Sequence, residues 1–182
     1  MKLLISITFS IFLFNLSSAQ QTNEYNDFVN QFKKIDSKPL INYWKNGNLQ
    51  FKTTENTYEY NNETFNTYSG ELNWYHENGQ ISFEGLVDQY GKLMYLKTYD
   101  EDGNITGESI VTKIDSRARS VTEFINPDKG IISKVVKVKH YKFSKKLGVN
   151  YLHQEGVTIN GEKSGVWKIY KDNGSLKKEK KH

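Results

Sequence analysis

Residues 74–83 of the chain read Trp74-Tyr75-His76-Glu77-Asn78-Gly79-Gln80-Ile81-Ser82-Phe83. Asn-Gly between two runs of β-prone residues is the strongest short signal for a β-hairpin. A type I′ turn needs a positive φ at both central residues, and Asn and Gly adopt that conformation at low cost. A two-residue loop at Asn78-Gly79 would place Trp74 opposite Phe83. The segment therefore predicts a hairpin whose side chains can be assigned to two faces.

The same pattern occurs four times: Tyr, any residue, a charged residue, Asn or Asp, Gly, any residue, and Leu or Ile. The copies are residues 43–49, 75–81, 99–105 and 170–176. Internal periodicity in the range of roughly 20 to 50 residues is typical of a repeat array. The long interval before the last copy predicts degenerate copies of the repeat around Phe124 to Ile131 and Lys146 to Tyr151. We therefore expect an all-β protein, an elongated twisted antiparallel sheet of repeated β-hairpins with a short N-terminal helix.

Alternation along each strand separates the apolar residues from the recurring tyrosines. The expected core face carries Trp44, Leu49, Phe51, Leu72, Trp74, Ile81, Phe83, Leu96, Ile105, Trp167, Ile169 and Leu176. The other face is expected to carry the tyrosines, opposite Gln50, Ser82, Thr106 and Lys177.

The tyrosines form the candidate ligand face, which consists of Tyr43, Tyr75, Tyr99 and Tyr170. Aromatic rings at regular spacing can stack on sugars or on peptide side chains. The same rings can instead pack between successive hairpins, where cross-strand aromatic pairs stabilise a sheet. The sequence favours packing and leaves both interpretations open.

The N-terminal region predicts export. Residues 1–19 have the layout of a secretory signal peptide, with Lys2, a short apolar run and the small residues Ser17, Ser18 and Ala19. The apolar run is shorter than the roughly 20 residues of a membrane-spanning helix, so no transmembrane segment is expected after cleavage. Localisation is therefore predicted to be periplasmic or extracellular.

Two further regions follow the signal peptide. Residues 20–38 form an N-terminal segment in which Tyr25, Phe28, Val29, Phe32 and Ile35 have the spacing of a short amphipathic helix. Residues 39–182 form the β-hairpin repeat domain.

Composition limits the class of protein. Hydrophobic residues make up 36% of the chain and aromatic residues 14%; a disordered chain would be poor in aromatics. The absence of cysteine excludes disulfides. Residues 1–110 hold eight Lys and Arg against fourteen Asp and Glu, and residues 111–182 hold seventeen against seven. This charge asymmetry could serve to bind an acidic partner or an anionic surface, or to support self-association. The sequence favours a simpler interpretation, a solvated lysine face that opposes aggregation.

Residues 161–176 resemble the bacterial variant of the MORN repeat, a module with Gly-x-Trp, Tyr, Asn-Gly and Leu positions. Residues 68–85 are similar to it at seven positions: Gly70, Trp74, Tyr75, Asn78, Gly79, Ile81 and Gly85. The module is also found in proteins labelled YwqK-family antitoxins. The resemblance implies an elongated, twisted antiparallel sheet in which each hairpin leans on the next. Eukaryotic relatives are associated with membrane surfaces and scaffolding, whereas the antitoxin label implies neutralisation of a toxin in the cytoplasm, against which the signal peptide argues.

Motifs of catalysis and cofactor binding are not found. Glu162 precedes Lys163 where a phosphate-binding loop needs glycine, and the four histidines lack the spacing of a zinc site. Asp100 and Asp102 lie beside a tight turn and lack the ligand-rich loop of a calcium site. The sequence thus predicts no catalytic residues, no cofactor, no metal and no nucleic-acid partner.

The leading functional hypothesis is an exported, non-enzymatic interaction or structural module that presents a sheet surface to a protein, glycan or envelope partner. Two alternatives remain: an antitoxin-like inhibitor of a partner protein, and a secreted enzyme whose site is not visible in sequence. The sequence specifies neither the partner nor the oligomeric state.

Overall fold

The computed structural model describes residues 20–182, so the predicted signal peptide lies outside the described residues. The fold is a β-sheet with two short helices. The elements are β1 (Gln20–Gln21), α1 (Asn23–Val29), β2 (Lys33–Tyr43), β3 (Leu49–Tyr60), β4 (Glu63–Tyr75), β5 (Ile81–Val87), β6 (Leu93–Tyr99), β7 (Ile105–Ser116), α2 (Val121–Ile125), β8 (Ile132–Ser144), β9 (Val149–Ile159), β10 (Glu162–Tyr170) and β11 (Leu176–Lys181).

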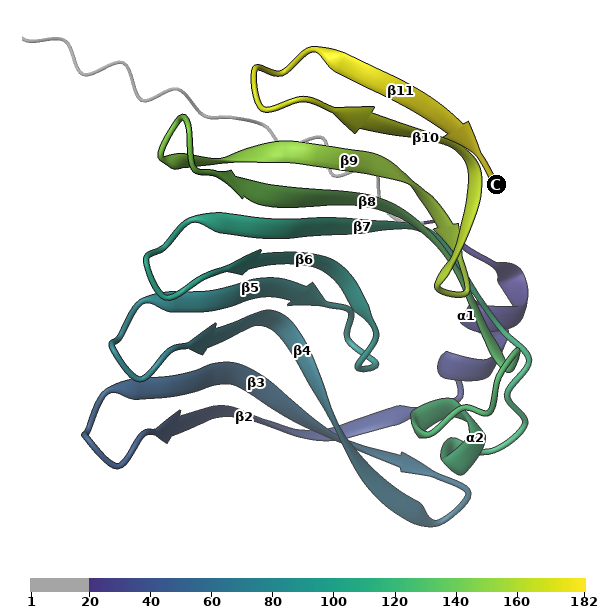
Figure 1. Cartoon of the computed structure of the whole chain (residues 1–182). Coiled ribbons are helices and arrows are strands. Elements are labelled where there is room, and N and C mark those ends of the chain that lie inside the picture. Colours follow the sequence, from purple (N-terminus) through teal and green to yellow (C-terminus); the bar gives the residue numbers. More distant parts are fainter. Residues whose placement is uncertain (1–19) are drawn as a thin grey trace, which may run out of the picture.

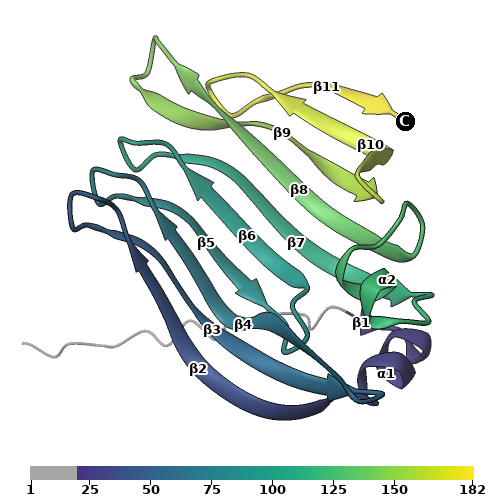
Figure 2. The same ribbon diagram turned by 90° about the horizontal axis from the view of Figure 1, so that it is seen from below.

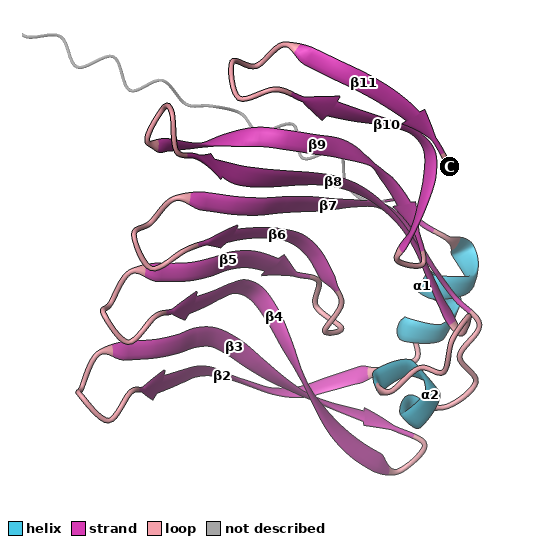
Figure 3. Ribbon diagram, in the orientation of Figure 1, coloured by secondary structure: helices cyan, strands magenta, loops and turns pink. Residues whose placement is uncertain are grey.

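Strands β2 to β11 lie side by side in chain order, each antiparallel to the next, while β1 pairs in parallel with β7. The sheet is open, curved and twisted (Figures 1 and 2). The connections β2–β3, β4–β5, β6–β7, β8–β9 and β10–β11 all lie at one end of the sheet, which we call the loop end. Both helices lie at the opposite end, the helical end (Figure 3). The predicted all-β class, antiparallel hairpin repeats and N-terminal helix are confirmed.

The loops of the four repeat copies are not the expected two-residue turns. In the second copy the amide of Gly79 donates to the carbonyl of His76 at 2.9 Å, and the amide of His76 donates to the carbonyl of Gln80 at 2.8 Å. Gly79 has a φ of 85°, but Asn78 is not among the residues with positive φ. This is a three-residue loop in which a type I turn is followed by a left-handed glycine. Two-residue loops with positive φ at both positions occur instead at Asn61-Asn62 and Asn160-Gly161.

The longer loop moves residues between faces. Tyr75 pairs with Ile81 rather than with Ser82, and a bulge at Ser82 then restores the predicted pairing of Trp74 with Phe83. The other copies behave alike, because Tyr43, Tyr99 and Tyr170 pair with Leu49, Ile105 and Leu176. Paired residues share a face of the sheet. The apolar residue after each glycine therefore lies on the tyrosine face, and the assignment of Leu49, Ile81, Ile105 and Leu176 to the core face was wrong.

Helix α1 begins after Thr22, whose side chain accepts from the amide of Tyr25 at the N-cap. The helix ends at Val29, so Ile35 lies in β2 and not on the helix. Helix α2 was not predicted. Ser120 caps it by accepting from the amide of Glu123, a Ser-x-x-Glu signal that the sequence does contain.

Of the two degenerate copies expected between the third and the last repeat, one is a hairpin and the other is not. Residues around Phe124 to Ile131 contain part of α2 and are not a hairpin. Residues around Lys146 to Tyr151 do lie at a hairpin, the β8–β9 loop, where the amide of Gly148 donates to the carbonyl of Ser144 at 2.8 Å. The lysine-rich C-terminus forms a regular strand, because β11 pairs with β10 as far as Lys181.

The main hydrophobic core lies at the helical end rather than under the tryptophans. Its buried residues are Tyr25, Phe28, Val29, Phe32, Tyr58, Tyr90, Val111, Ile114, Ala118, Val121 and Phe124. On the expected core face only Phe51 and Trp167 are buried, and Leu176 is 49% exposed. The helices supply a second layer at one end of the sheet. The loop end is correspondingly left as a single layer.

Both edge strands carry lysines. β2 contains Lys33, Lys34, Lys38 and Pro39, and β11 reads Leu-Lys-Lys-Glu-Lys-Lys. Lysine and proline on an edge strand oppose pairing with another chain. The structure thus agrees with the interpretation that part of the lysine excess protects the sheet.

Gly79→Val is expected to lower the free energy of unfolding by more than about 1 kcal/mol, because a β-branched residue at a φ of 85° is an outlier. Chemical denaturation measures this loss. Gln80→Val, at the next and exposed position, is the matched control and should change little. Equal stability of the two variants would contradict the loop geometry.

Candidate functional site

The four tyrosines of the candidate ligand face lie at the loop end. Tyr43, Tyr75, Tyr99 and Tyr170 are the last residues of β2, β4, β6 and β10 (Figure 1). Tyr43 is 63% exposed, and the other three are half-buried. Each therefore lies one residue before a three-residue loop, in the same position of its repeat.

Two of these tyrosines are fixed by hydrogen bonds to the preceding strand. The Tyr99 hydroxyl donates to Glu84 at 2.7 Å, and the Tyr170 hydroxyl donates to Glu155 at 2.6 Å. Burial and then the bond to Glu84 raise the pKa of Tyr99, and the bond to Glu155 raises that of Tyr170. Their hydroxyls are thus used within the sheet, while their rings still line its surface. Whether the four rings bind a ligand remains a prediction.

The glutamates that receive these bonds belong to a row of paired charges. Direct cross-strand neighbours from β5 to β11 alternate in sign: Glu84, Lys97, Glu108, Lys139, Glu155, Lys168 and Glu179. We call these residues the charge row. Lys139 lies 2.9 Å from Glu108, and Lys97 lies 3.8 Å from Glu84. Opposite charges on adjacent strands stabilise their register.

A groove of about 330 Å³ lies over the charge row between β7 and β10. Its floor includes Glu108, Lys139, Glu155 and Lys168, and its apolar lining includes Ile110, Val157 and Val166. The surface is therefore shallow, with both charged and apolar groups.

Side chains in the loops connect successive repeats. Asn46 accepts from the amide of Asn48 and donates to the carbonyl of Glu77 at 2.8 Å. Asn78 repeats this arrangement towards Glu101, also at 2.8 Å. The asparagine of Asn-Gly thus serves as a link between repeats. In the third copy Asp102 replaces this asparagine, and its carboxylate cannot donate such a bond. The regular series of repeats is interrupted after this copy.

A second cleft, of about 540 Å³, lies at the loop end between the β8–β9 and β10–β11 loops. Its lining is Phe143, Ser144, Lys145, Lys146, Tyr151, His153, Tyr170, Lys171, Asp172 and Lys177. We call this site the basic cleft. The Ser144 hydroxyl donates to Asp172 at 3.1 Å, which joins the two loops. One predicted residue, Tyr170, contributes to the site, whereas Tyr43, Tyr75 and Tyr99 do not line it.

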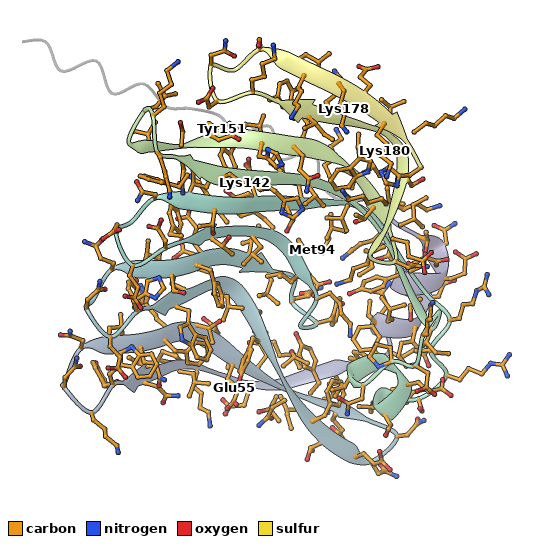
Figure 4. All side chains as sticks on the ribbon, viewed as in Figure 1. Glu55, Met94, Lys142, Tyr151, Lys178 and Lys180 are labelled. Atoms are coloured by element: carbon orange, nitrogen blue, oxygen red, sulfur yellow. The ribbon has the colours of Figure 1, made fainter. Side chains whose placement is uncertain are left out.

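The basic cleft belongs to a wider positive region. Lys142 and Tyr151 are paired on β8 and β9, and Lys178 and Lys180 come from β11 (Figure 4). Burial, then Lys142 and Lys177, lower the pKa of His153. The sequence did not predict this cleft, although the excess of lysine after residue 110 was its signal.

Neither a metal-binding cluster nor a membrane-spanning helix is found in the part of the chain that the structure describes. Among residues 20–182 no group of three or more His, Cys, Asp and Glu could hold a metal ion. No helix among them is long and apolar enough to cross a membrane.

The best copies of the repeat share one further irregularity. In β4 the pairing with β3 skips from Ser69 to Asn73, and in β10 the pairing with β9 skips from Ser164 to Lys168. The glycines that follow the two serines, Gly70 and Gly165, have φ values of 72° and 67°. Both segments therefore make the same wide bulge and end in the same tyrosine and loop.

Residues 68–89 and 163–181 match the family model described as MORN repeat variant. These matches cover the two segments with the shared bulge and confirm the resemblance at two of the four copies. The copies at 43–49 and 99–105 lie outside the matches but form the same three-residue loop. No curated protein matches the chain.

His140 should make stability depend on pH. Partial desolvation and then the charge of Lys163 lower its pKa below the usual value near 6.5, so the folded state favours neutral imidazole. That stabilisation is complete above the pKa of the unfolded chain and is lost as the pH falls through the folded pKa. We expect the free energy of unfolding to fall more steeply between pH 7.5 and 5.5 in the wild type than in His140→Gln. Equal slopes in denaturation curves would contradict this.

Proposed function

We propose that the chain is an exported, non-enzymatic interaction module that presents the loop end and the face of its charge row to a protein, glycan or envelope partner. The observation that carries the proposal is the repetition of one geometry. Equivalent tyrosines precede equivalent loops at one end of one sheet. Regular presentation on a rigid sheet suits a binding surface that spans several repeats.

Three other observations support it. The matching family model is a repeat, and MORN repeats are generally non-enzymatic modules. Within residues 20–182 the two helices cover the helical end of the sheet and leave the loop end uncovered. The loop end can therefore meet a partner. Export rests on the predicted signal peptide, and the glycan or protein nature of the partner rests on the tyrosines.

Capture of a partner tests the proposal. Residues 20–182 are immobilised and exposed to envelope and cytoplasmic fractions of the source organism, and bound material is identified after crosslinking. We expect a specific partner from the envelope fraction, and weaker capture by Tyr43→Ala/Tyr75→Ala. The control variant Ile125→Ala changes an apolar side chain that is 38% exposed at the helical end and should retain capture.

Other outcomes would contradict the proposal. A cytoplasmic toxin as the specific partner would favour the antitoxin-like function suggested by the resemblance to YwqK-family proteins. If the variant Tyr43→Ala/Tyr75→Ala melts like the wild type and captures the partner equally well, the tyrosines are not part of the binding surface. For export, intact mass of the native protein should correspond to a start near Gln20, and a cytoplasmic protein that retains Met1 would contradict it.

A further inference from the structure

We propose that the basic cleft binds an acidic saccharide, with its lysines on the carboxylate or sulfate groups and its tyrosine rings against the sugar. The inference rests on the proposed function, because it names a partner class for one part of that surface.

The charges of the basic cleft favour the binding of an anion. Lys145, Lys146 and Lys171 come from two neighbouring loops and Lys177 from the start of β11, and Asp172 is the only carboxylate of the lining. Among the described residues none of the four lysines lies within ion-pair distance of a carboxylate, whereas Lys139 and Lys97 on the charge row do. Four like charges at one site repel one another and raise the local concentration of anions.

The aromatic lining favours a sugar over a bare phosphate. Tyr151 and Tyr170 are half-buried in the wall, and Phe143 is 58% exposed at the same site. Aromatic rings provide apolar area at a low cost in conformational entropy. The hydroxyl of Tyr170 is held by Glu155, so this ring is oriented before a ligand arrives. A cleft of about 540 Å³ is also in the ordinary range for small ligands.

The type of cation suits a flexible ligand. The arginines of the chain are Arg117 and Arg119, which are not in the cleft. Arginine provides a planar fork that suits both carboxylate and phosphate, whereas lysine is a compact charge on a flexible stem. Four flexible charges around two rings suit a chain of sugars whose acidic groups vary in spacing.

His153 should tie this binding to pH. The groups around it are Tyr151 on its own strand, Lys142 and His140 on β8, Lys163 on β10 and Lys177 on β11. These cations and burial favour the neutral ring in the free protein. A bound anion offsets them, so protonation and binding support each other and affinity should rise as the pH falls.

Calorimetric titration of residues 20–182 tests the proposal. The probes are a sulfated heparin hexasaccharide and a galacturonic acid hexamer, compared with neutral dextran oligomers, inorganic polyphosphate and anionic lipid vesicles. The variant Lys145→Gln/Lys146→Gln/Lys171→Gln/Lys177→Gln removes the cleft charges. Its matched control, Lys34→Gln/Lys45→Gln/Lys52→Gln/Lys113→Gln, changes four exposed lysines elsewhere and gives the same net charge.

We expect an acidic hexasaccharide to bind, more tightly at pH 5.5 than at 7.5, and dextran not to bind. The cleft variant should weaken binding about 30-fold and the control variant less than about 3-fold. Tyr151→Ala should weaken saccharide binding about 5-fold while leaving polyphosphate binding unchanged.

Several results would overturn the inference: no binding of either acidic hexasaccharide, an equal loss in the two quadruple variants, or polyphosphate or vesicles binding more tightly than the saccharides. Insensitivity of saccharide binding to Tyr151→Ala would also overturn it. Partner capture by the cleft variant separates this from the proposed function. If capture persists while no saccharide binds, the interaction module stands and the saccharide site fails.

Discussion

Trp167→Ala is expected to lower the free energy of unfolding by about 3–5 kcal/mol, the usual loss for a buried aromatic residue. Trp167 is 1% exposed and its ring nitrogen donates to the carbonyl of Val157 at 3.0 Å. Its neighbours include His140 and the amine of Lys163, which lies 4.0 Å from the ring centre. Chemical denaturation measures the loss. Val166→Ala, at an adjacent position that is 51% exposed, is the control and should cost little.

The space for this ring depends on a glycine of the neighbouring strand. A Cβ on Gly156 would lie 2.4 Å from Cδ2 of Trp167, closer than real Cβ contacts. Gly156→Ala is therefore expected to destabilise the protein by about 1–3 kcal/mol through overpacking. In the Trp167→Ala background the same change should cost almost nothing, because the ring is gone. Additive losses in the double-mutant cycle would contradict this packing.

Phe124→Ala is expected to lower the free energy of unfolding by a similar amount, about 3–5 kcal/mol. Phe124 is 0% exposed, and its ring centre lies 5.5 to 5.8 Å from those of Tyr25, Phe28 and Phe32. The amine of Lys92 lies 3.9 Å from the same ring centre and donates to the carbonyl of Phe124.

The matched control is Ile125→Ala, since Ile125 is the next residue of α2 and is 38% exposed. The measurement is again chemical denaturation, in which the control should remain close to the wild type. A small loss for Phe124→Ala would show that α2 does not hold the helical end together. It would also contradict the placement of the main core there.

The sequence predicts the position of the hairpins well and their faces less well. Asn-Gly, or Asp-Gly in the third copy, marks a loop correctly in each of the four copies, because a left-handed residue is needed whichever loop forms. It does not distinguish a two-residue loop from a type I turn followed by glycine, since both accept the dipeptide. Ser82 illustrates the consequence: its bulge cancels the shift from the longer loop, so Trp74 still pairs with Phe83 while Ile81 changes face.

The position of the core could not be predicted because it depends on contacts between distant segments. Tyr58, Tyr90 and Phe124 lie in three separate parts of the chain and meet only when β3, the β5–β6 loop and α2 are folded. The capping signal at Ser120 was present in the sequence, but the repeat pattern favoured a hairpin there. Tertiary packing outweighed the periodicity.

The candidate site was predicted only in part, again because it depends on contacts between distant segments. The tyrosines could be found because they recur in sequence, and Tyr170 is also in the basic cleft. The lysines of that cleft do not recur, and they come together only because β8–β9 and β10–β11 place their loops side by side. A charge imbalance along the chain indicates such a region but not its location.

The claim that the loop end meets the partner is tested most directly by site-specific photocrosslinking. A photoreactive phenylalanine is placed at Tyr43 and at Phe143, which are exposed at the loop end, and at Ile125, which is exposed at the helical end. After illumination in the source organism, we expect covalent adducts with one partner from Tyr43 and Phe143 and none from Ile125. Adducts from Ile125 alone would contradict the account and place the interaction at the helical end.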